Sequence, residues 1–254
     1  MEFQLGLVSI SFRSLSFEQI IARVKAAGLA SVEWGGDVHV PAGRADVAHL
    51  VREATEAAGL AVSEYGSYYR LGFSLPEEID AVVACARALG TDTVRVWAYN
   101  KGSAEATGEE YRRTVSDARR ICAQFPDLTF CTECHNNTLT DDYRANLRLL
   151  EDVGMANFAS FWQPNQHKSF AYNMESARAL SPFVKAVHTF AWEGNERFPL
   201  AEHRDRWVEY LSVFAQEPKI KVMLEFMHDD SPDSLSTTAA ELKNIISAVQ
   251  GTQR

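Results

Sequence analysis

The chain has 254 residues, enough for one large domain or two small ones, and its 46% hydrophobic content is ordinary for a globular protein. Its formal net charge of −9 argues against nucleic acid or an anionic membrane as a partner, because both attract clustered positive charge. No apolar run approaches the roughly 18 residues of a membrane span, and the start Met-Glu-Phe-Gln-Leu lacks a secretory signal, so we expect a soluble cytoplasmic protein.

The first half of the chain alternates short apolar runs with helical patterns. Strands are predicted at Phe3–Ser11, Leu29–Trp34, Leu60–Tyr65 and Thr93–Trp97. Helices are predicted from Ser16 to Gly28, over Ala45–Ala58, from Ser74 to Gly90 and from Thr107 to about Gln124. The first of these helices opens with the capping box Ser-Phe-Glu-Gln and ends at a glycine, which are the usual start and stop signals.

The second half of the chain repeats the same alternation. Strands are predicted at Leu128–Glu133, Asn157–Trp162, Val184–Thr189 and Lys219–Phe226. Helices are predicted from Asp141 to Gly154, over Met174–Leu180, and over about Arg204–Ala215 and Ser236–Val249. The whole chain therefore contains eight strand–helix pairs, repeated at roughly 30 residues, the length of a βαβ unit.

Eight such pairs predict an α/β protein with a (β/α)₈ TIM barrel, a single domain over residues 1–254. The competing architecture is a doubly wound open sheet, which usually carries a glycine-rich phosphate loop after an early strand. The sequence contains neither G-x-G-x-x-G nor G-x-x-x-x-G-K-[ST], so the barrel is favoured.

Cys131 and Cys134 form a C-x-x-C pair that resembles a redox or zinc motif. The pair lies on a predicted strand, where positions three apart point to opposite faces. A thioredoxin-type pair needs a helix start after the first cysteine, and a zinc site needs further ligands that no second C-x-x-C supplies. We therefore expect these two cysteines to be structural.

Three polar residues stand at the ends of strongly apolar strands: Glu133, His188 and Glu225. In a TIM barrel the carboxyl ends of all strands meet at one face, where active sites lie. A buried carboxylate or imidazole needs a partner, and converging Glu, His and Glu suit one divalent cation. The alternative is that each residue makes a separate salt bridge or hydrogen bond.

These strand ends resemble the xylose isomerase-like TIM barrels, a superfamily of sugar isomerases and epimerases. That resemblance implies a metal held by Glu133, Gln163, His188 and Glu225, with Mn, Mg, Co or Zn as the ion. Gln163 is a departure, because the superfamily usually has Asp-Pro-Gly-His where this chain has Gln-Pro-Asn-Gln. A glutamine oxygen can ligate a hard cation but adds no negative charge, so the departure bears on the substrate and on the metal.

The resemblance implies a divalent-metal-dependent isomerase or epimerase that moves a proton next to the carbonyl of a sugar or keto-sugar through an enediolate. Glu133 and Glu225 would then exchange the proton, and His135 is a second candidate base. A lyase or dehydratase acting on a keto-sugar, keto-inositol or keto-glycoside would need the same metal and base. A non-catalytic sugar-binding barrel is the second alternative, supported by Gln163.

Aromatic and cationic residues near the strand ends are candidates for binding a sugar or polyol. The aromatic set is Trp34, Tyr68, Trp97, Trp162 and Trp192, and the others are His39, Arg70, Arg95 and Arg197. Sugar rings stack on aromatic faces, although tryptophans can also simply fill a barrel mouth. Related barrels form dimers or tetramers, so a homodimer or homotetramer is expected. The superfamily branch that cleaves damaged DNA uses three metals and a basic face, which this acidic chain with seven histidines does not match.

Overall fold

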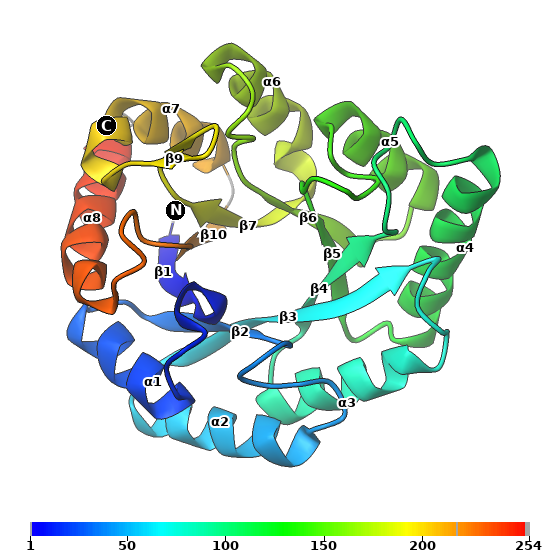
Figure 1. The fold of residues 1–254 in the computed structure, drawn as a ribbon, viewed down its shortest axis with the longest axis horizontal. Helices are drawn as coiled ribbons and strands as arrows, with labels where there is room; N and C mark the ends of the chain where they lie inside the picture. Colours follow the sequence, from blue (N-terminus) through cyan, green and yellow to red (C-terminus); the bar gives the residue numbers. More distant parts are fainter. Residues whose placement is uncertain (1, 217, 252–254) are drawn as a thin grey trace.

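A computed structural model describes residues 2–216 and 218–251 and has eight parallel strands closed into a barrel (Figure 1). The neighbouring strands follow one another around the barrel in the order β1-β10-β7-β6-β5-β4-β3-β2. Their bounds are β1 Glu2–Val8, β2 Ser31–Gly35, β3 Ala61–Leu71, β4 Thr93–Ala98, β5 Thr129–Glu133, β6 Phe158–Trp162, β7 Val184–Thr189 and β10 Lys219–Leu224. The (β/α)₈ fold predicted from the sequence is therefore confirmed.

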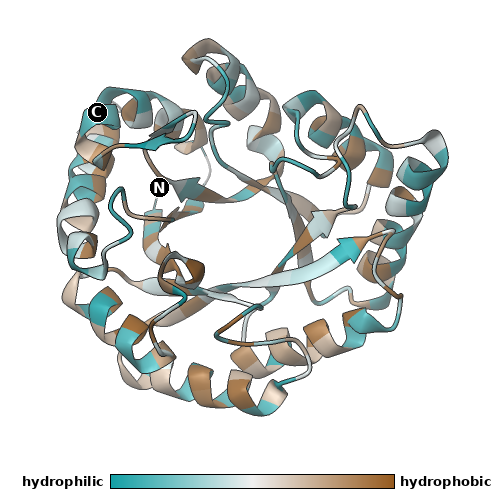
Figure 2. Cartoon of the chain, in the orientation of Figure 1, coloured by the Kyte–Doolittle hydropathy of each residue, from teal (hydrophilic) through white to brown (hydrophobic). Residues whose placement is uncertain are grey.

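An α-helix follows each barrel strand, and the helices form the outer ring in Figure 1. They are α1 Phe17–Ala26, α2 Ala45–Ala57, α3 Glu78–Leu89, α4 Gly108–Gln124, α5 Tyr143–Val153, α6 Phe170–Leu180, α7 Arg204–Phe214 and α8 Leu235–Gly251. Short 3₁₀ helices occur at η1 Ser9–Phe12, η2 Ser181–Phe183, η3 Leu200–His203 and η4 Pro232–Ser234. Figure 2 shows apolar and polar residues alternating along these helices, as expected when one face packs on the barrel.

Local sequence signals account for several helix boundaries. Ser16 and Thr107 both form complete capping boxes with the residue three positions on. Gly90 and Gly154 end α3 and α5 in the left-handed conformation, where a side chain would be strained. Helix α6 begins four residues before its predicted start, because the Ser169 side chain accepts a hydrogen bond from the Tyr172 amide.

The strand predicted at Phe3–Ser11 ends at Val8, where the 3₁₀ helix η1 begins, and two further segments differ from the sequence prediction near the mouth of the barrel. Strand β3 continues to Leu71, six residues beyond its predicted end at Tyr65, so Tyr68 and Arg70 lie on a strand rather than in a loop. A small antiparallel hairpin, β8 Trp192–Glu193 with β9 Glu196–Arg197, follows β7 outside the barrel. Both segments add walls to the carboxyl-terminal face.

The pairing of β2 with β3 contains a register shift that affects which side chains face inward. Val32 pairs with Val62, but Glu33 pairs with Glu64, so β3 carries one extra residue, Ser63. Such a bulge re-aims the side chains that follow it. Both glutamates are almost completely buried in the barrel.

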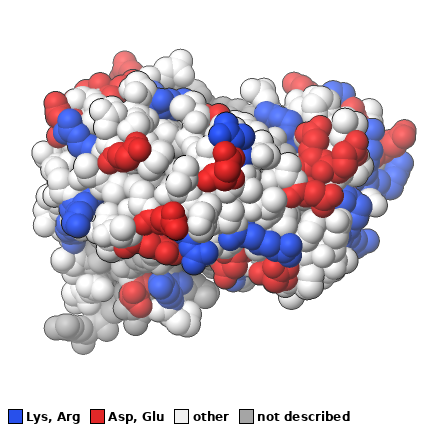
Figure 3. Space-filling view, turned by 90° about the horizontal axis from the view of Figure 1, so that it is seen from below, with Lys and Arg blue, Asp and Glu red and all other residues white. Residues whose placement is uncertain are grey.

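On the face drawn in Figure 3, basic and acidic side chains intermingle. Among residues 2–216 and 218–251, no helix is both long enough and apolar enough to cross a membrane.

Candidate metal centre and active site

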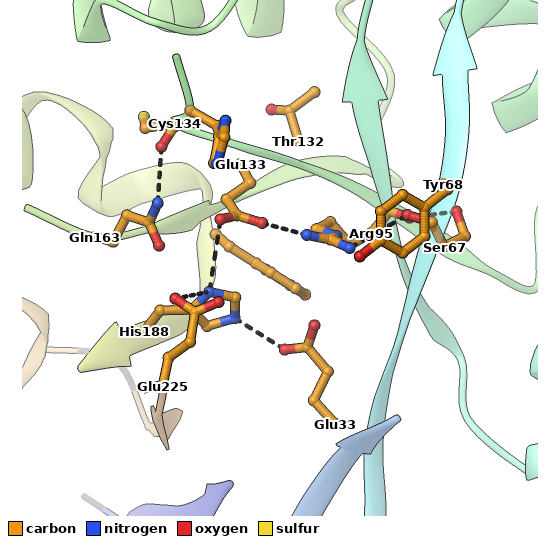
Figure 4. A network of polar contacts seen from close by, with 12 residues as sticks. Glu33, Ser67, Tyr68, Arg95, Thr132, Glu133, Cys134, Gln163, His188 and Glu225 are labelled. Atoms are coloured by element: carbon orange, nitrogen blue, oxygen red, sulfur yellow. Dashed lines mark hydrogen bonds and ion pairs between the residues drawn. The ribbon is translucent and has the colours of Figure 1, made fainter. Parts of the chain in front are cut away.

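Glu133 at the end of β5, His188 on β7 and Glu225 directly after β10 come together inside the barrel (Figure 4). One ligand atom from each residue lies within 4.8 Å of the other two, and all three side chains are buried. The Nδ1 atom of His188 is 3.8 Å from a Glu133 oxygen and 3.6 Å from a Glu225 oxygen. Their convergence is the arrangement expected from three polar residues at the ends of apolar strands.

Glu33 of β2 contacts the other nitrogen of the His188 ring: Oε2 of Glu33 lies 2.8 Å from Nε2 of His188. Burial lowers the pKa of His188, but Glu33 and Glu225 outweigh it and raise that pKa to about 10. In the metal-free protein His188 is therefore protonated at neutral pH. The Nδ1 atom of the ring faces the oxygens of Glu133 and Glu225.

The two carboxylates of the cluster have different partners. Glu133 Oε2 accepts a hydrogen bond of 2.7 Å from Arg95 Nη1, and both side chains are buried. Burial raises the pKa of Glu133, but Arg95 and His188 overcome this and lower it. Burial, followed by the nearby carboxylates, instead raises the pKa of Glu225 to about 7. Glu133 is therefore a fixed anion, whereas Glu225 can gain or lose a proton near neutrality.

Gln163 lies directly after β6, and its amide is held in one orientation. Its Nε2 donates to the Cys134 carbonyl oxygen over 3.0 Å. Its Oε1 is buried and has no hydrogen-bond partner among the described residues. Figure 4 shows this side chain on the same side of the barrel as the cluster. An unpartnered buried oxygen is a suitable additional ligand for a hard cation.

The polar atoms of the site fit a divalent cation. His188 Nδ1 and Gln163 Oε1 are both buried without a hydrogen-bond partner in the described part of the chain. The barrel interior holds four buried carboxylates, Glu33, Glu64, Glu133 and Glu225. The two cationic partners are Arg95 on Glu133 and Lys221, 3.2 Å from Glu64. With His188 neutral, one divalent cation would balance the two remaining negative charges.

A cavity of about 640 Å³ opens above this cluster and includes Glu133, Gln163 and Glu225 in its wall. Five of the predicted substrate-binding residues also line it: Tyr68, Arg70, Arg95, Trp97 and Trp192. Arg95 lies over the Trp97 ring at 4.2 Å and over the Tyr68 ring at 5.4 Å, so two aromatic side chains fix the guanidinium. Arg70 donates to the Tyr99 carbonyl oxygen over 3.0 Å.

His135, the second candidate base, also lines the cavity. Its ring packs edge-on against Trp97 at 4.8 Å, and Nδ1 is 2.8 Å from the Asn136 carbonyl oxygen. A carbonyl oxygen only accepts, so Nδ1 carries the hydrogen and Nε2 is left with its lone pair. The position suits a base that acts from the side of the cavity.

Three predicted substrate-binding residues lie elsewhere. Trp162 is fully buried under helices, packs against Trp207 and donates its indole N–H to Ser176. Trp34 is also fully buried, with its ring 5.8 Å from His39, which contacts the Leu15 carbonyl oxygen through Nε2. None of Trp34, His39 and Trp162 lines the cavity, and the contacts of all three are those of packing residues.

Arg197 stands at the edge of the site on β9. It pairs with Asp230 and lies 4.5 Å from the centre of the Trp192 ring. It is not part of the cavity wall, but it supports an aromatic residue that is. Cys131 is fully buried, and Cys134 accepts from Asn146 over 3.2 Å, positions that agree with the structural role expected for the C-x-x-C pair.

Five residues at or near the cavity were not among those expected from the sequence: Glu33, Arg13, Asp37, Phe190 and Phe226. Arg13 and Tyr68 both bond to Asp37, which joins the segments after β1 and β2 to β3. Phe190 and Phe226 add apolar wall. Glu33 could have been found, because it is a charged residue at the end of an apolar strand, as Glu133 is.

The closed barrel with buried Glu, His and Glu at its carboxyl-terminal end defines the class as a TIM barrel with a candidate metal centre. No protein-family model matches the chain. Known structures nevertheless show that it has the fold of the xylose isomerase-like TIM barrels, which confirms the resemblance predicted from the sequence at the level of the fold.

The chain is similar to a dehydratase of Bacillus anthracis both in sequence and in structure. The chain is 24% identical to its 3-dehydroshikimate dehydratase in an alignment of 203 residues, and the match covers 74% of this chain and 71% of that protein. The crystal structure of the probable 3-DHS dehydratase from this organism superposes with a TM-score of 0.76 and 20% identity, covering 96% of this chain and 99% of the other.

An epimerase has the same architecture. D-psicose 3-epimerase from Clostridium cellulolyticum H10, solved with D-tagatose, gives a TM-score of 0.71 with 14% identity. The match covers 97% of this chain and 99% of the epimerase. Barrels of this fold therefore include an enzyme named for dehydration and one named for epimerisation.

Proposed function

We propose that this protein is a divalent-metal-dependent enzyme that removes the proton next to the carbonyl of a small polyhydroxylated ketone. The observation that carries the proposal is the buried Glu133–His188–Glu225 cluster, whose ligand atoms lie within 4.8 Å of one another at the floor of a cavity. Gln163, with its unpartnered oxygen, is the proposed fourth ligand. The ion would act as a Lewis acid on the substrate carbonyl and hydroxyl oxygens.

The remaining chemistry belongs to the side chains of this chain. Glu225 is the proposed base, because it lines the cavity and, among the described residues, no guanidinium group forms a hydrogen bond with it. Glu133 stays ionised because it pairs with Arg95, and this ion pair fixes the position of its carboxylate. His135 faces the same cavity and is the proposed acid or base for a second proton. Trp97, Trp192 and Tyr68 provide aromatic surfaces for the apolar faces of the substrate.

Elimination of water is the outcome that the site supports best. After Glu225 removes the proton beside the carbonyl, the electron pair forms a C=C bond as the C–O bond at the next carbon breaks. The leaving hydroxyl takes the proton that Glu225 has removed and departs as water, which returns Glu225 to its carboxylate form. This reaction needs one carboxylate base, and the Arg95–Glu133 ion pair leaves Glu225 as the carboxylate without a cationic hydrogen-bond partner among the described residues. The similarity to a 3-dehydroshikimate dehydratase in both sequence and structure supports the same outcome.

An isomerase or epimerase is the second candidate. Glu133 and Glu225 both reach the cavity wall, so two carboxylates can face one substrate. An epimerase that returns the proton to the opposite face needs each of them to act as a base in turn. The Arg95 partner of Glu133 weakens one of the two, which is why we rank this candidate second.

Proton NMR in D₂O tests both candidates. The Mn²⁺-loaded enzyme would be incubated with 3-dehydroshikimate, D-psicose or D-tagatose, and the metal removed before spectra are recorded. We expect a ring hydroxyketone to lose water, with new vinyl or aromatic signals. Deuterium incorporation with an intact carbon skeleton would instead favour the isomerase or epimerase.

The controls are a chelated sample and the variant Glu225→Gln. Both should lack exchange and elimination. Turnover that persists in either sample would contradict the proposed metal or base. A protein that binds these ketones but never exchanges their protons would support the non-catalytic binding barrel.

A further inference from the structure

His188 is held from across the barrel by a residue that is not one of the four proposed ligands. Its Nε2 atom lies 2.8 Å from Oε2 of Glu33, and both side chains are buried. Glu33 is on β2 and His188 on β7, strands that are separated around the barrel by β10 and β1. Figure 4 shows Glu33 on the far side of the imidazole from Glu133 and Glu225.

The chemistry of this contact determines how the imidazole is oriented. An ionised carboxylate can only accept a hydrogen bond, so Nε2 must carry the hydrogen. In the neutral ring Nδ1 then has a free lone pair. That lone pair faces the oxygens of Glu133 and Glu225 at 3.8 and 3.6 Å, and Nδ1 has no hydrogen-bond partner among the described residues. The two carboxylates and the lone pair of Nδ1 repel one another, so a cation between them stabilises this arrangement.

The backbone around Glu33 is built to admit its carboxylate. The extra residue in β3 shifts the pairing at Glu33. A Cβ atom at Gly66, the next inward position on β3, would lie 2.8 Å from Glu33 Oε1 and 3.3 Å from Arg95 Nη2. The side chains of Glu33 and Arg95 are both buried, so neither can move aside easily for a Cβ atom at Gly66. The absence of a side chain at Gly66 therefore leaves the space that Glu33 occupies.

We infer that Glu33 is a positioning residue for the metal centre, fixing the Nε2–H tautomer and the ring orientation of His188 so that Nδ1 is presented to the ion. The inference rests on the metal site of the proposed function. Loss of a group that orients a metal-bound histidine typically weakens metal binding by about 10- to 100-fold.

Isothermal titration of the metal-free protein with Mn²⁺ tests the inference without requiring a substrate. Glu33→Leu removes the acceptor at similar size and should weaken binding by about 10- to 100-fold, and Glu33→Gln, which keeps an acceptor oxygen, should weaken it less. The matched control is Glu64→Gln, which removes an equally buried charge that does not contact His188. That control should weaken Mn²⁺ binding less than Glu33→Leu does, which separates the hydrogen bond to His188 from the loss of a buried carboxylate.

Nitrogen-15 NMR of histidine-labelled wild-type protein loaded with Zn²⁺ gives a second readout that does not depend on a variant folding. We expect His188 to show a hydrogen on Nε2 and a metal-bound Nδ1. A hydrogen on Nδ1, or Mn²⁺ binding by Glu33→Leu within threefold of the wild type, would overturn the role of Glu33 and leave the metal site standing. A wild-type protein that binds no Mn²⁺ would overturn both the inference and the proposed function.

Discussion

At the scale of single residues, two carboxylates with the same chemistry receive different properties from their surroundings. Glu133 is paired with Arg95 inside the barrel. Glu225 is buried next to His188 and to other carboxylates. A buried ion pair broken on one side leaves an uncompensated charge, which is strongly unfavourable. The two residues should therefore respond differently to the same substitution.

We expect Glu133→Gln to lower the free energy of unfolding of the metal-free protein by about 3–5 kcal/mol, because Arg95 loses its buried partner. Glu225→Gln should cost less than about 1 kcal/mol at pH 8, because it removes a carboxylate whose ionisation burial opposes. Urea unfolding followed by tryptophan fluorescence measures both. Equal losses in the two variants would contradict the assigned partners.

The pKa shifts also predict how stability depends on pH. Folding raises the pKa of His188 to about 10 and that of Glu225 to about 7, so the folded metal-free protein binds more protons than the unfolded chain. Stability must then fall as pH rises. Between pH 6.5 and 8.5 the loss should be about 3 kcal/mol, as chemical denaturation at a series of pH values would show. A flat or rising profile over this range would disagree with a protonated His188.

The cluster of Glu133, His188 and Glu225 was predictable because its members are titratable residues at the ends of apolar strands. Glu33 is also a charged residue at the end of an apolar strand. Its contact with His188, 155 residues away, cannot be read from the sequence. The ion pair between Arg95 and Glu133 was missed for the same reason, since it depends on the register between β4 and β5. Local chemistry was predictable, whereas cross-barrel pairing was not.

At the scale of the elements, the alternation of side chains along a strand decides which residues reach the cavity. Glu33 faces inward, so Trp34 must face the helices, and the inward Phe161 and Gln163 place Trp162 outward in the same way. Arg95 and Trp97 are two residues apart and share the inner face. The strand and helix positions were predicted closely, but treating each tryptophan near a strand end as cavity wall ignored this alternation.

A pair of alanine variants tests the two kinds of tryptophan. Trp162→Ala should lower the free energy of unfolding by about 3–5 kcal/mol, because a fully buried indole is lost from the helix layer. Trp192→Ala should cost about 1 kcal/mol or less but raise KM, since this ring lines the cavity. Denaturant titration and steady-state kinetics give the two quantities. A large stability loss for Trp192→Ala with unchanged KM would reverse the assignment.

At the scale of the whole molecule, the barrel gathers charges from strands that are distant in the sequence. Glu33, Glu64, Glu133 and Glu225 come from four strands or strand ends, and only Arg95 and Lys221 offset them as permanent cations within the described interior. The fold was predictable from eight repeated strand–helix pairs, because each pair is a local signal. The charge balance of the interior follows only from the closed barrel.

This balance predicts that a divalent cation stabilises the folded state. A ligand present at 100 times its dissociation constant adds about 2.7 kcal/mol to the free energy of unfolding. The melting temperature of the metal-free protein should rise with added Mn²⁺, while His188→Ala should show no such rise. A melting temperature that is independent of Mn²⁺ in the wild type would argue against binding to the folded protein.

The most direct test of the metal centre is the anomalous diffraction of crystals grown with Mn²⁺ and measured above the manganese absorption edge. We predict one strong peak between Glu133, His188 and Glu225, within about 2.3 Å of His188 Nδ1 and with Gln163 Oε1 as an additional ligand. Two results would contradict the central claim. One is the absence of a peak at this site at saturating Mn²⁺. The other is a manganese peak elsewhere in the protein, with His188 contacting carboxylates and no metal ion.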